Sequence, residues 1–277
     1  MTIGEWLRYA QQALEQSASP DPAPDAEWIL IWATGISRVQ LKLCAAQPLL
    51  GEQLEKAQKA LEERIKGRPL QHILGEAWFY GRRFICDERA LIPRQDTEIL
   101  CETAINHILP GKRQVLDMCT GSGIIAVTVA LERPMCAVTA ADLSPRALSL
   151  AQENAALNAA DIRFVETDMF SALEGEKYDA ILSNPPYLTS QEMTKLQSEV
   201  RSDPEMALFG GEDGLEFYRI LAKEAKEHLR EHGCIVLEIG STQAQAVCEL
   251  LREHLAVVSM GVEKDLQGLD RVVWAHI

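Results

Sequence analysis

The sequence has little that would place it in a membrane, in a disulfide-stabilised scaffold or among metal-binding proteins. No apolar run approaches the roughly 20 residues that a membrane-spanning helix needs. The segment Met1–Trp6 lacks the basic stretch followed by an apolar run that is typical of a secretory signal. The seven cysteines are scattered without a Cys-x-x-Cys pair, and the six histidines lack the spacing of metal ligands. We therefore predict a cytoplasmic protein with reduced thiols, no membrane partner and no metal site.

Basic side chains are also few. The 27 Lys and Arg residues stand against 41 Asp and Glu residues, so the formal net charge is −14. Because sequence-independent binding to nucleic acid depends on Lys and Arg that neutralise phosphates, we expect no direct nucleic-acid partner, although a local basic patch is compatible with this balance. Hydrophobic residues make up 47% and charged residues 25% of the 277 residues, which predicts a folded chain with a main domain and a smaller one.

Helical periodicity dominates residues 1–75, where segments with Pro or Gly separate runs of apolar residues at helical spacing. The tryptophans of this part are predicted to be core residues: Trp6, Trp28 and Trp32. Residues 76–92 contain two short aromatic or apolar segments around Gly81, which predicts a β-hairpin linker. We therefore predict a small helical domain, this linker, and a main domain over residues 93–277.

Strands and helices alternate in the main domain. The predicted strands are 114–117, 136–141, 162–166, 178–183, 233–239 and 271–275. Ser144 and Pro145 are typical of the cap and the first residue of a helix. The alternation predicts an α/β fold, with a doubly wound, mostly parallel, Rossmann-like sheet beside the small helical N-terminal domain. Such sheets bind ligands beyond the carboxyl ends of their strands.

A glycine turn follows the first predicted strand, at Thr120-Gly121-Ser122-Gly123. Glycines at such a place permit a tight turn and let the backbone approach a ligand closely. The turn alone does not identify the ligand, since similar turns bind nicotinamide or flavin cofactors and some bind nothing. It is not a Walker A loop, because no Gly-Lys-Ser or Gly-Lys-Thr follows.

Acids follow the next two strands. Asp142 comes after strand 136–141, where a carboxylate can accept hydrogen bonds from both ribose hydroxyls of a nucleoside. The alternative is an acid that caps the next helix. Asp168 follows the third strand, where it could accept from an adenine amino group while Met169 or Phe170 covers the ring; an ordinary turn is the alternative. These residues predict a nucleoside site without deciding between a nicotinamide and a sulfonium.

The motif Asn184-Pro185-Pro186-Tyr187 follows an apolar strand. Two successive prolines fix two φ angles and remove two backbone donors, which leaves a stiff edge of carbonyl groups beside the Asn184 amide and the Tyr187 ring. Such an edge can accept hydrogen bonds from an NH₂ group and stack a planar group. These are the needs of a weakly nucleophilic amide or amine nitrogen during methyl transfer. A rigid turn with no chemical role is the alternative.

Taken together, the motifs resemble those of the release-factor glutamine methyltransferases, the HemK-type enzymes, over nearly the whole chain. The segments that carry the resemblance are Leu91–Glu98, the glycine turn, Asn184–Tyr187, Pro204–Leu215 and Lys264–Arg271. The Asn-Pro-Pro-Tyr element alone is shared with amino-methylating DNA enzymes. The Pro-Arg-x-x-Thr-Glu and Gly-Gly-x-Asp-Gly segments make the resemblance more specific.

The resemblance implies a reaction and a partner. The methyl donor would be S-adenosylmethionine, released as S-adenosylhomocysteine, and the acceptor would be the glutamine amide in the Gly-Gly-Gln loop of peptide-chain release factors. Asn184 and the Pro185 carbonyl would take the two amide hydrogens, and Tyr187 would pack the glutamine. The proton would be lost to solvent without a strong general base. We also expect residues 1–75 to dock the release factor away from its Gly-Gly-Gln loop.

The candidate site residues follow from these arguments. Those expected to bind the donor are Cys119, Thr120, Gly121, Ser122, Gly123, Asp142, Asp168, Met169 and Asn184. Those expected to bind the acceptor are Asn184, Pro185, Pro186 and Tyr187, of which Asn184, Pro185 and Tyr187 are the catalytic candidates.

Some alternatives stay open. The family usually has glycine where Cys119 stands, so this side chain either crowds the donor or points toward the sheet. Arg94 and Glu98 either form a structural ion pair or line the site. The nearest functional rival is the sister enzyme that methylates a glutamine of a ribosomal protein. Rivals of other classes are a nucleic-acid adenine methyltransferase, which the negative charge disfavours, and a nucleotide-binding module without catalysis.

Overall fold

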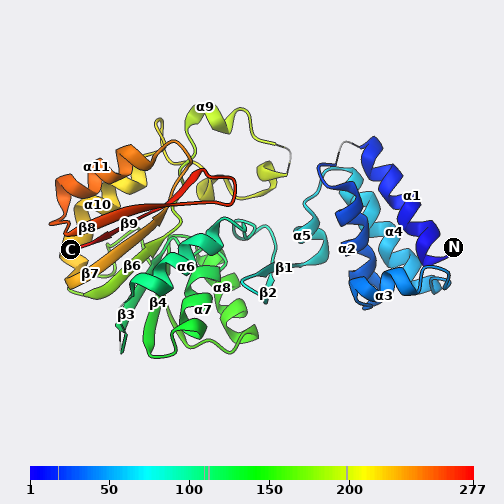
Figure 1. Cartoon of the computed structure of the whole chain (residues 1–277), viewed down its shortest axis with the longest axis horizontal. Coiled ribbons are helices and arrows are strands. Elements are labelled where there is room, and N and C mark those ends of the chain that lie inside the picture. Colours follow the sequence, from blue (N-terminus) through cyan, green and yellow to red (C-terminus); the bar gives the residue numbers. More distant parts are fainter. Residues whose placement is uncertain (18, 109, 112, 198) are drawn as a thin grey trace. The chain divides into compact units, whose positions relative to one another are not determined.

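The structure is a computed structural model that describes residues 1–17, 19–108, 110–111, 113–197 and 199–277. These residues form two compact units. Figure 1 labels most of their helices and strands. The first unit contains Met1–Glu76 and Gln197–Ser202, and the second contains Ala77–Leu196 and Asp203–Ile277. Each unit has its own hydrophobic core.

The first unit is helical, as its sequence predicts. Its helices are α1 (Ile3–Gln16), α2 (Pro22–Thr34), α3 (Arg38–Leu43), α4 (Gly51–Ile65) and α5 (Leu70–Leu74). Proline at the first position of α2 and Gly35 at its end, with φ of 74°, delimit that helix. The two short helices α3 and α5 were not predicted, because helical periodicity cannot be recognised over five or six residues.

The core of this first unit holds one buried charge pair. Arg64 of α4 donates from Nε to Asp25 Oδ2 of α2 at 2.6 Å, and it also binds Glu199. Trp6 is fully buried, as predicted, whereas the prediction for Trp28 is wrong, because 40% of it is exposed. Helix α2 carries apolar residues around its whole circumference, so one of its apolar sides faces water.

The predicted hairpin consists of β1 (Glu76–Phe79) and β2 (Arg82–Ile85). Tyr80 and Gly81 at its turn have φ of 49° and 72°, the left-handed values of a tight two-residue hairpin turn. Phe79 and Phe84 are buried in the core of the second unit. The hairpin thus contributes to the packing of that unit.

A seven-stranded sheet forms the centre of the second unit, in the order β5-β4-β3-β6-β7-β9-β8. Its strands are β3 (Arg113–Met118), β4 (Cys136–Asp142), β5 (Ile162–Glu166), β6 (Tyr178–Ser183), β7 (Leu229–Glu238), β8 (Ser259–Lys264) and β9 (Asp270–His276). The neighbours from β5 to β7 are parallel, and β9 is antiparallel to both β7 and β8. The predicted mostly parallel α/β sheet is confirmed. Strand β8 was not predicted, because this edge strand has few apolar residues.

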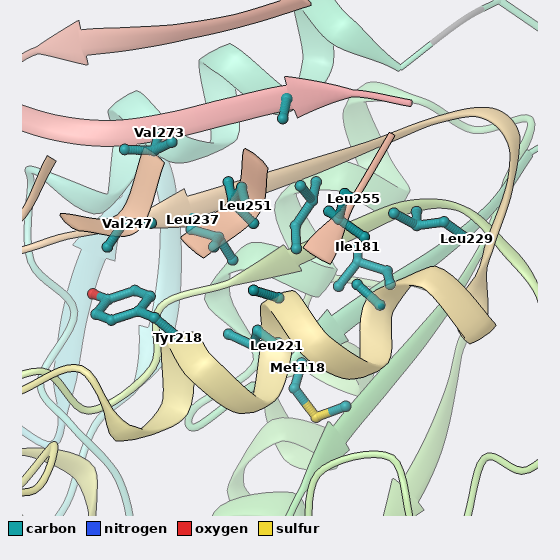
Figure 2. Packing of buried hydrophobic residues seen from close by; sticks show 14 of the residues in the cluster. Met118, Ile181, Tyr218, Leu221, Leu229, Leu237, Val247, Leu251, Leu255 and Val273 are labelled. Atoms are coloured by element: carbon teal, nitrogen blue, oxygen red, sulfur yellow. The ribbon is translucent and has the colours of Figure 1, made fainter. Parts of the chain in front are cut away.

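Helices cover both faces of the sheet. The elements outside the sheet are α6 (Thr97–His107), α7 (Ile124–Glu132), α8 (Pro145–Leu157), α9 (Ser190–Met193), α10 (Glu216–His228), α11 (Ala244–His254) and the 3₁₀ helices Val200–Ser202, which lies in the first unit, and Glu205–Ala207. Helices α10 and α11 pack on one face, here termed the α10 face, and Figure 2 shows Leu221 and Leu251 in one cluster with Ile181 and Leu237 of the sheet. Helices α6, α7 and α8 pack on the other face, here termed the α6 face.

The strand order reverses between β3 and β6. The chain runs outward from β3 through β4 to β5 and then returns to place β6 on the other side of β3. Doubly wound sheets bind ligands at such a switch point, beyond the carboxyl ends of the strands. The glycine turn follows β3 and the Asn-Pro-Pro-Tyr motif follows β6, so the topology brings both motifs to this place.

The described part of the chain has no helix that is long and apolar enough to cross a membrane. The seven cysteines are all free.

Candidate active site

A cavity of about 630 Å³ lies at the switch point of the sheet, within the second unit. The ends of the first four strands of the sheet contribute to it, as do residues that follow Asp203 in the sequence. The predicted site residues that line it are Cys119, Thr120, Gly121, Ser122, Asp142, Asp168, Met169, Asn184 and Pro186. The sequence therefore predicted residues that the fold brings together from four separate strands.

Backbone geometry forces glycine in the turn after β3. Gly123 has φ of 81°, and a Cβ there would lie 2.9 Å from Ala151 Cβ of α8. Gly121 has φ of 54° and donates from its backbone N to Asp142 Oδ2 at 2.8 Å. Thr120 donates from its backbone N to the Ala141 carbonyl at 3.0 Å. The turn is therefore fixed to β4 and lies against α8.

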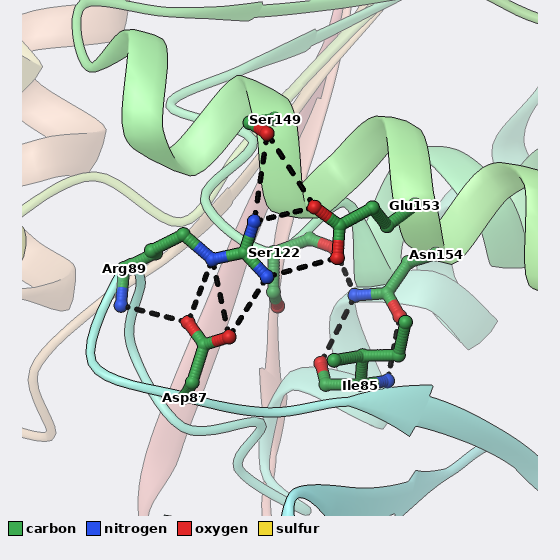
Figure 3. A network of polar contacts seen from close by, with 7 residues as sticks. All are labelled: Ile85, Asp87, Arg89, Ser122, Ser149, Glu153 and Asn154. Atoms are coloured by element: carbon green, nitrogen blue, oxygen red, sulfur yellow. Dashed lines mark hydrogen bonds and ion pairs between the residues drawn. The ribbon is translucent and has the colours of Figure 1, made fainter.

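Asn154 of α8 fastens the turn to the hairpin, as Figure 3 shows. Its Nδ2 donates to the carbonyls of Ser122 at 2.9 Å and Ile85 at 3.1 Å, and its Oδ1 accepts from Ile85 N at 2.6 Å. Asn154 is fully buried. The Asn154 amide thus joins α8, the hairpin and the glycine turn. The hairpin in this way supports a turn that lines the cavity.

Asp142 has two hydrogen-bonding roles within the protein. Besides its bond with Gly121, its Oδ1 accepts from Ser144 N at 2.9 Å. Ser144 itself caps α8 through its side chain, which accepts from Ala147 N at 3.2 Å, so the prediction for Ser144 is confirmed and Asp142 is not the cap. Burial raises the pKa of the Asp142 carboxyl, and backbone hydrogen bonds from Ser144 and Gly121 counteract this.

Asp168 and Met169 lie at the cavity beyond the end of β5. Asp168 is exposed, whereas Met169 is buried. Met169 has φ of 45°, and its carbonyl accepts from Thr167 Oγ1 at 2.9 Å. A non-glycine residue in this region costs about 1–2 kcal/mol, and such strain concentrates at functional sites.

Cys119 also has a left-handed backbone, with φ of 61°. This conformation explains why glycine would suit the position. The side chain is half-buried, packs against the cluster on the α10 face, and also borders the cavity. Burial raises the pKa of the Cys119 thiol, and the negative charge of Asp142 raises it further. A protonated thiol is a poor nucleophile, which agrees with the absence of any role for it in methyl transfer.

Asp117 supports the glycine turn from β3, and the sequence analysis missed this role. It is fully buried in β3, and its Oδ2 accepts from Thr120 Oγ1 at 2.6 Å and from Ala126 N at 3.1 Å. Its Oδ1 has no hydrogen-bond partner among the described residues. Burial raises its pKa to about 7, although the bonds from Thr120 and Ala126 lower it. An acid within an apolar strand just before a glycine turn was the available signal.

Asn184 and Pro186 of the Asn-Pro-Pro-Tyr motif border the cavity, whereas Pro185 and Tyr187 do not. Asn184 donates from Nδ2 to Thr97 Oγ1, at the start of α6, at 3.3 Å. The preceding Ser183 donates from Oγ to the Met118 carbonyl at 2.6 Å, which joins the ends of β6 and β3. Pro185 is buried, and Pro186 borders the cavity.

The Gly-Gly-x-Asp-Gly segment packs directly on the Asn-Pro-Pro-Tyr motif. A Cβ on Gly210 would lie 2.6 Å from the Pro186 carbonyl oxygen, and one on Gly214 would lie 2.3 Å from that of Tyr187. Gln243 donates from Nε2 to the carbonyls of Tyr187 at 3.0 Å and Gly214 at 3.1 Å. The Tyr187 side chain packs against the α10-face cluster, and burial raises its pKa to about 12. Close packing therefore holds the motif in place.

Of the two alternatives for Arg94 and Glu98, an ion pair between them is wrong. Arg94 pairs from Nη2 with Asp203 Oδ2 at 2.6 Å, and Glu98 Oε1 instead accepts from the backbone N of Tyr80 at 2.6 Å. Arg94 borders the cavity, so the alternative that it lines the site is confirmed for this residue. Glu98 therefore satisfies a backbone donor of the hairpin turn.

Comparisons with known proteins agree with this geometry. Residues 5–75 match the family described as PrmC N-terminal domain, and residues 95–205 match the family described as Methyltransferase small domain. Solved structures with a similar fold include a methyltransferase from Pyrococcus furiosus, with a TM-score of 0.55 and 19% identity over 71% of this chain and 89% of that one. Another is the 16S rRNA N2 G1207 methyltransferase of T. thermophilus in complex with AdoMet and guanosine, with a TM-score of 0.51 and 18% identity over 73% and 49%. At these identities the likeness establishes the fold alone.

Full-length relatives are more similar. The release factor glutamine methyltransferase of Koribacter versatilis is 38% identical over 99% of this chain and 98% of its own length. That of Cereibacter sphaeroides is 40% identical over 100% of this chain and 99% of its own, and that of Bacillus subtilis is 35% identical over 100% and 98%. On this similarity along its whole length, the chain belongs to the release factor glutamine methyltransferase family.

Proposed function

We propose that this enzyme transfers a methyl group from S-adenosylmethionine to the side-chain amide nitrogen of the glutamine in the Gly-Gly-Gln motif of peptide-chain release factors. The products are N5-methylglutamine and S-adenosylhomocysteine, and the reaction modulates translation termination. The observation that carries the proposal is the position of the Asn-Pro-Pro-Tyr motif, of which Asn184 and Pro186 border the same cavity as the glycine turn at the switch point. Membership of the family supplies the expected acceptor.

The cavity fits S-adenosylmethionine. Its volume of about 630 Å³ lies within the range of small-molecule sites, and the carboxylates of Asp142 and Asp168 border it as acceptors for the hydroxyl and amino groups of a nucleoside. Asp142 would hold the ribose, Asp168 and Met169 the adenine, and the turn after β3 the methionine part. The candidates in that turn are Cys119, Thr120, Gly121, Ser122 and Gly123. Asn184 is the remaining donor-binding candidate. The donor supplies an electrophilic methyl group on a sulfonium, so the transfer needs no covalent enzyme intermediate.

The acceptor amide would bind against the Asn-Pro-Pro-Tyr motif. Asn184 Oδ1 and the Pro185 carbonyl would accept its two N–H bonds, while Pro186 and Tyr187 shape the surface that packs the glutamine. These acceptors favour the nitrogen lone pair along the line of attack and stabilise the positive charge that develops as the nitrogen–carbon bond forms and the carbon–sulfur bond breaks. The nitrogen then loses a proton to solvent. A cationic amide is a strong acid, so no strong general base is needed.

We also propose that residues 1–75 dock the release factor away from its Gly-Gly-Gln loop, with residues 76–92 as the connection to the catalytic part at 93–277. Among residues 1–75, Tyr9 and Trp28 are aromatic side chains that are available for docking, because they are 46% and 40% exposed. Replacing both with Ala in the full chain should raise the KM for the release factor about tenfold or more with little change in kcat. An unchanged KM would contradict docking through these residues.

The experiment that tests the proposed function is incubation with labelled S-adenosylmethionine and a choice of acceptors, followed by mass mapping of the modified residue. The acceptors are a purified release factor, ribosomal proteins and DNA. We expect label on the glutamine of the Gly-Gly-Gln motif. Label on a ribosomal protein but not on the release factor, or label on DNA adenine, would overturn the assignment.

A further inference from the structure

Glu238, at the end of β7, lies beside Asn184 at the end of β6. The two strands are parallel, and Ser183 pairs with Leu237, so the next residue of each strand is a neighbour of the other. Side chains alternate between the faces of a sheet. Leu182 and Val236 both pack on the α6 face, and therefore Asn184 and Glu238 both point to that side, where α6 begins.

The environment of Glu238 is unusual for a carboxylate. Only 2% of the residue is exposed, and its Oε2 has no hydrogen-bond partner among the described residues. Burial raises its pKa to about 7, whereas hydrogen bonding from Thr97, the charge of Arg271 and hydrogen bonding from Asn184 lower it, and the charge of Asp96 raises it. A buried acid without a full set of partners costs stability, so its presence needs a reason.

A count of donors around the Asn184 amide indicates what Glu238 does. The NH₂ group has two hydrogens. One is directed at Thr97 Oγ1 at 3.3 Å, and the register of β6 with β7 places the Glu238 carboxylate beside the same amide, where Asn184 lowers the pKa of that carboxyl. The NH₂ side of the amide therefore faces Thr97 and Glu238, which leaves Oδ1 for the cavity that Asn184 borders.

We propose that Glu238 is a positioning residue, which with Thr97 holds the Asn184 amide so that Oδ1 rather than the NH₂ group faces the acceptor. The inference rests on the proposed function, because an acceptor that carries an NH₂ group needs an oxygen opposite it. A rotated Asn184 would place two sets of N–H donors against each other. Such an arrangement repels the acceptor nitrogen and destabilises the charge that develops on it.

A double-mutant cycle tests this role. Glu238→Gln, whose amide can donate as well as accept, should lower kcat about tenfold or more with an unchanged affinity for S-adenosylhomocysteine. In an Asn184→Ala background the same change should lower kcat less than about twofold, because no amide remains to be oriented. Equal factors in both backgrounds, or no effect in the wild-type background, would overturn the proposal.

Controls separate positioning from folding. Asp179→Asn removes a carboxylate at the opposite end of β6, where Asp179 binds Arg113 and Arg230. This variant should lose stability while the folded protein keeps the wild-type kcat. If Glu238→Gln fails to fold, Thr97→Val replaces it in the same cycle and Thr97→Ser, which keeps the hydroxyl, is its matched control. Additive effects of Thr97→Val and Asn184→Ala would then contradict the proposal.

A readout without any acceptor distinguishes this inference from the proposed function. The side-chain amide resonance of Asn184, assigned by its loss in Asn184→Ala, should titrate near pH 7 in the wild type and not in Glu238→Gln. The other charged or titratable groups that interact with Glu238 are Asp96 before α6, Cys101 on α6, Tyr187 after β6, Tyr218 on α10 and Arg271 on β9. The absence of this titration from the wild type would overturn the role of Glu238, even if the release factor is methylated. Its presence would support that role even if the acceptor proves to be another protein.

Discussion

The two turns that contribute to the cavity, after β3 and after β6, are built in opposite ways. The turn after β3 is made of small residues with left-handed backbones, and side chains from elsewhere hold it through hydrogen bonds, as Asp142 does for Gly121 and Asn154 for Ser122. The turn after β6 is stiffened by Pro185 and Pro186, and it is held by close packing.

The difference matches what each turn has to do. A flexible backbone held by hydrogen bonds can approach a charged, polar donor closely. A stiff edge of oxygens can present fixed acceptors to a small planar group. Behind each turn lies one buried acid with a pKa raised to about 7, Asp117 behind the first and Glu238 behind the second. The comparison teaches that donor binding and acceptor orientation depend on separate supports.

The largest expected effect is on the acceptor side. Asn184→Ala removes one of the two oxygens proposed to accept from the amide and should lower kcat by about 10²–10³. The measurement is single-turnover methylation of the release factor. The matched control is Asn158→Ala, which removes an exposed bond to the Arg83 carbonyl and should keep kcat within about twofold. Unchanged methyl transfer by Asn184→Ala would sink the mechanism.

Close packing of the acceptor turn can be tested with a pair of glycines. Gly214 and Gly175 both have left-handed backbones, with φ of 71° and 76°. A Cβ on Gly214 would lie 2.3 Å from the Tyr187 carbonyl oxygen, whereas one on Gly175 would meet nothing within 4 Å. Both Ala variants should lose about 1–2 kcal/mol of stability through backbone strain. Gly214→Ala should lose more because its Cβ displaces the Tyr187 carbonyl, and it alone should lower kcat, by about tenfold or more. Equal activities would contradict the packing argument.

The buried carboxyl of Asp117 predicts a pH dependence of the free energy of unfolding. Because burial raises the pKa of Asp117 from 3.8 to about 7, the folded state keeps a proton that the unfolded state releases. Stability should therefore fall as pH rises from about 4 to about 7 and change no further above that range. Asp117→Asn should reduce the loss between pH 5 and pH 8 by an amount on the order of 2 kcal/mol in urea unfolding. An unchanged pH dependence would show that Asp117 is ionised in the folded protein across this range.

On the donor side, Asp142→Asn should weaken binding of S-adenosylhomocysteine about tenfold, because one charged acceptor for the ribose is lost. The KM for the release factor should stay the same, since the acceptor turn has its own supports. Titration calorimetry measures the first quantity and initial rates the second. The control is Asp161→Asn, which changes an exposed acid that follows α8 in the sequence. An equal, about tenfold, rise in the KM for the release factor would show that the two turns do not have separate supports.

The smallest effect is expected at Cys119. Cys119→Gly relieves the strain of a φ of 61° but loses the packing of the side chain against the α10-face cluster. The two contributions offset each other, so stability should change by less than about 1 kcal/mol and donor affinity by less than about threefold. A tenfold change in affinity, measured by calorimetry, would mean that the side chain contacts the donor directly.

Local sequence was sufficient for the parts of the fold that depend on local patterns. Strands β5 and β6 have the predicted bounds because they are short apolar runs between turns. The motif at Asn184–Tyr187 could be predicted because two adjacent prolines have direct consequences for the backbone. The Arg94–Asp203 pair joins residues 109 positions apart, and no local signal identifies such a partner.

The supports behind the two turns were beyond the reach of local patterns for the same reason. Glu238 has a function only through the register of β6 with β7 and through Thr97 at the start of α6. The glycines at 210 and 214 are required by carbonyl groups of another segment rather than by their own turn alone. Residue types and spacing therefore predicted the groups proposed to touch the ligands, whereas the residues that position these groups required the three-dimensional structure.

The most direct test of the central claim is methylation of a release factor in which the glutamine of the Gly-Gly-Gln motif is replaced by glutamate. Glutamate has the same shape but no NH₂ group for Asn184 and Pro185 to accept from. We predict methylation on the amide nitrogen of the unmodified motif and no transfer to the glutamate variant. Equal methyl incorporation into both proteins would place the acceptor elsewhere and contradict the account.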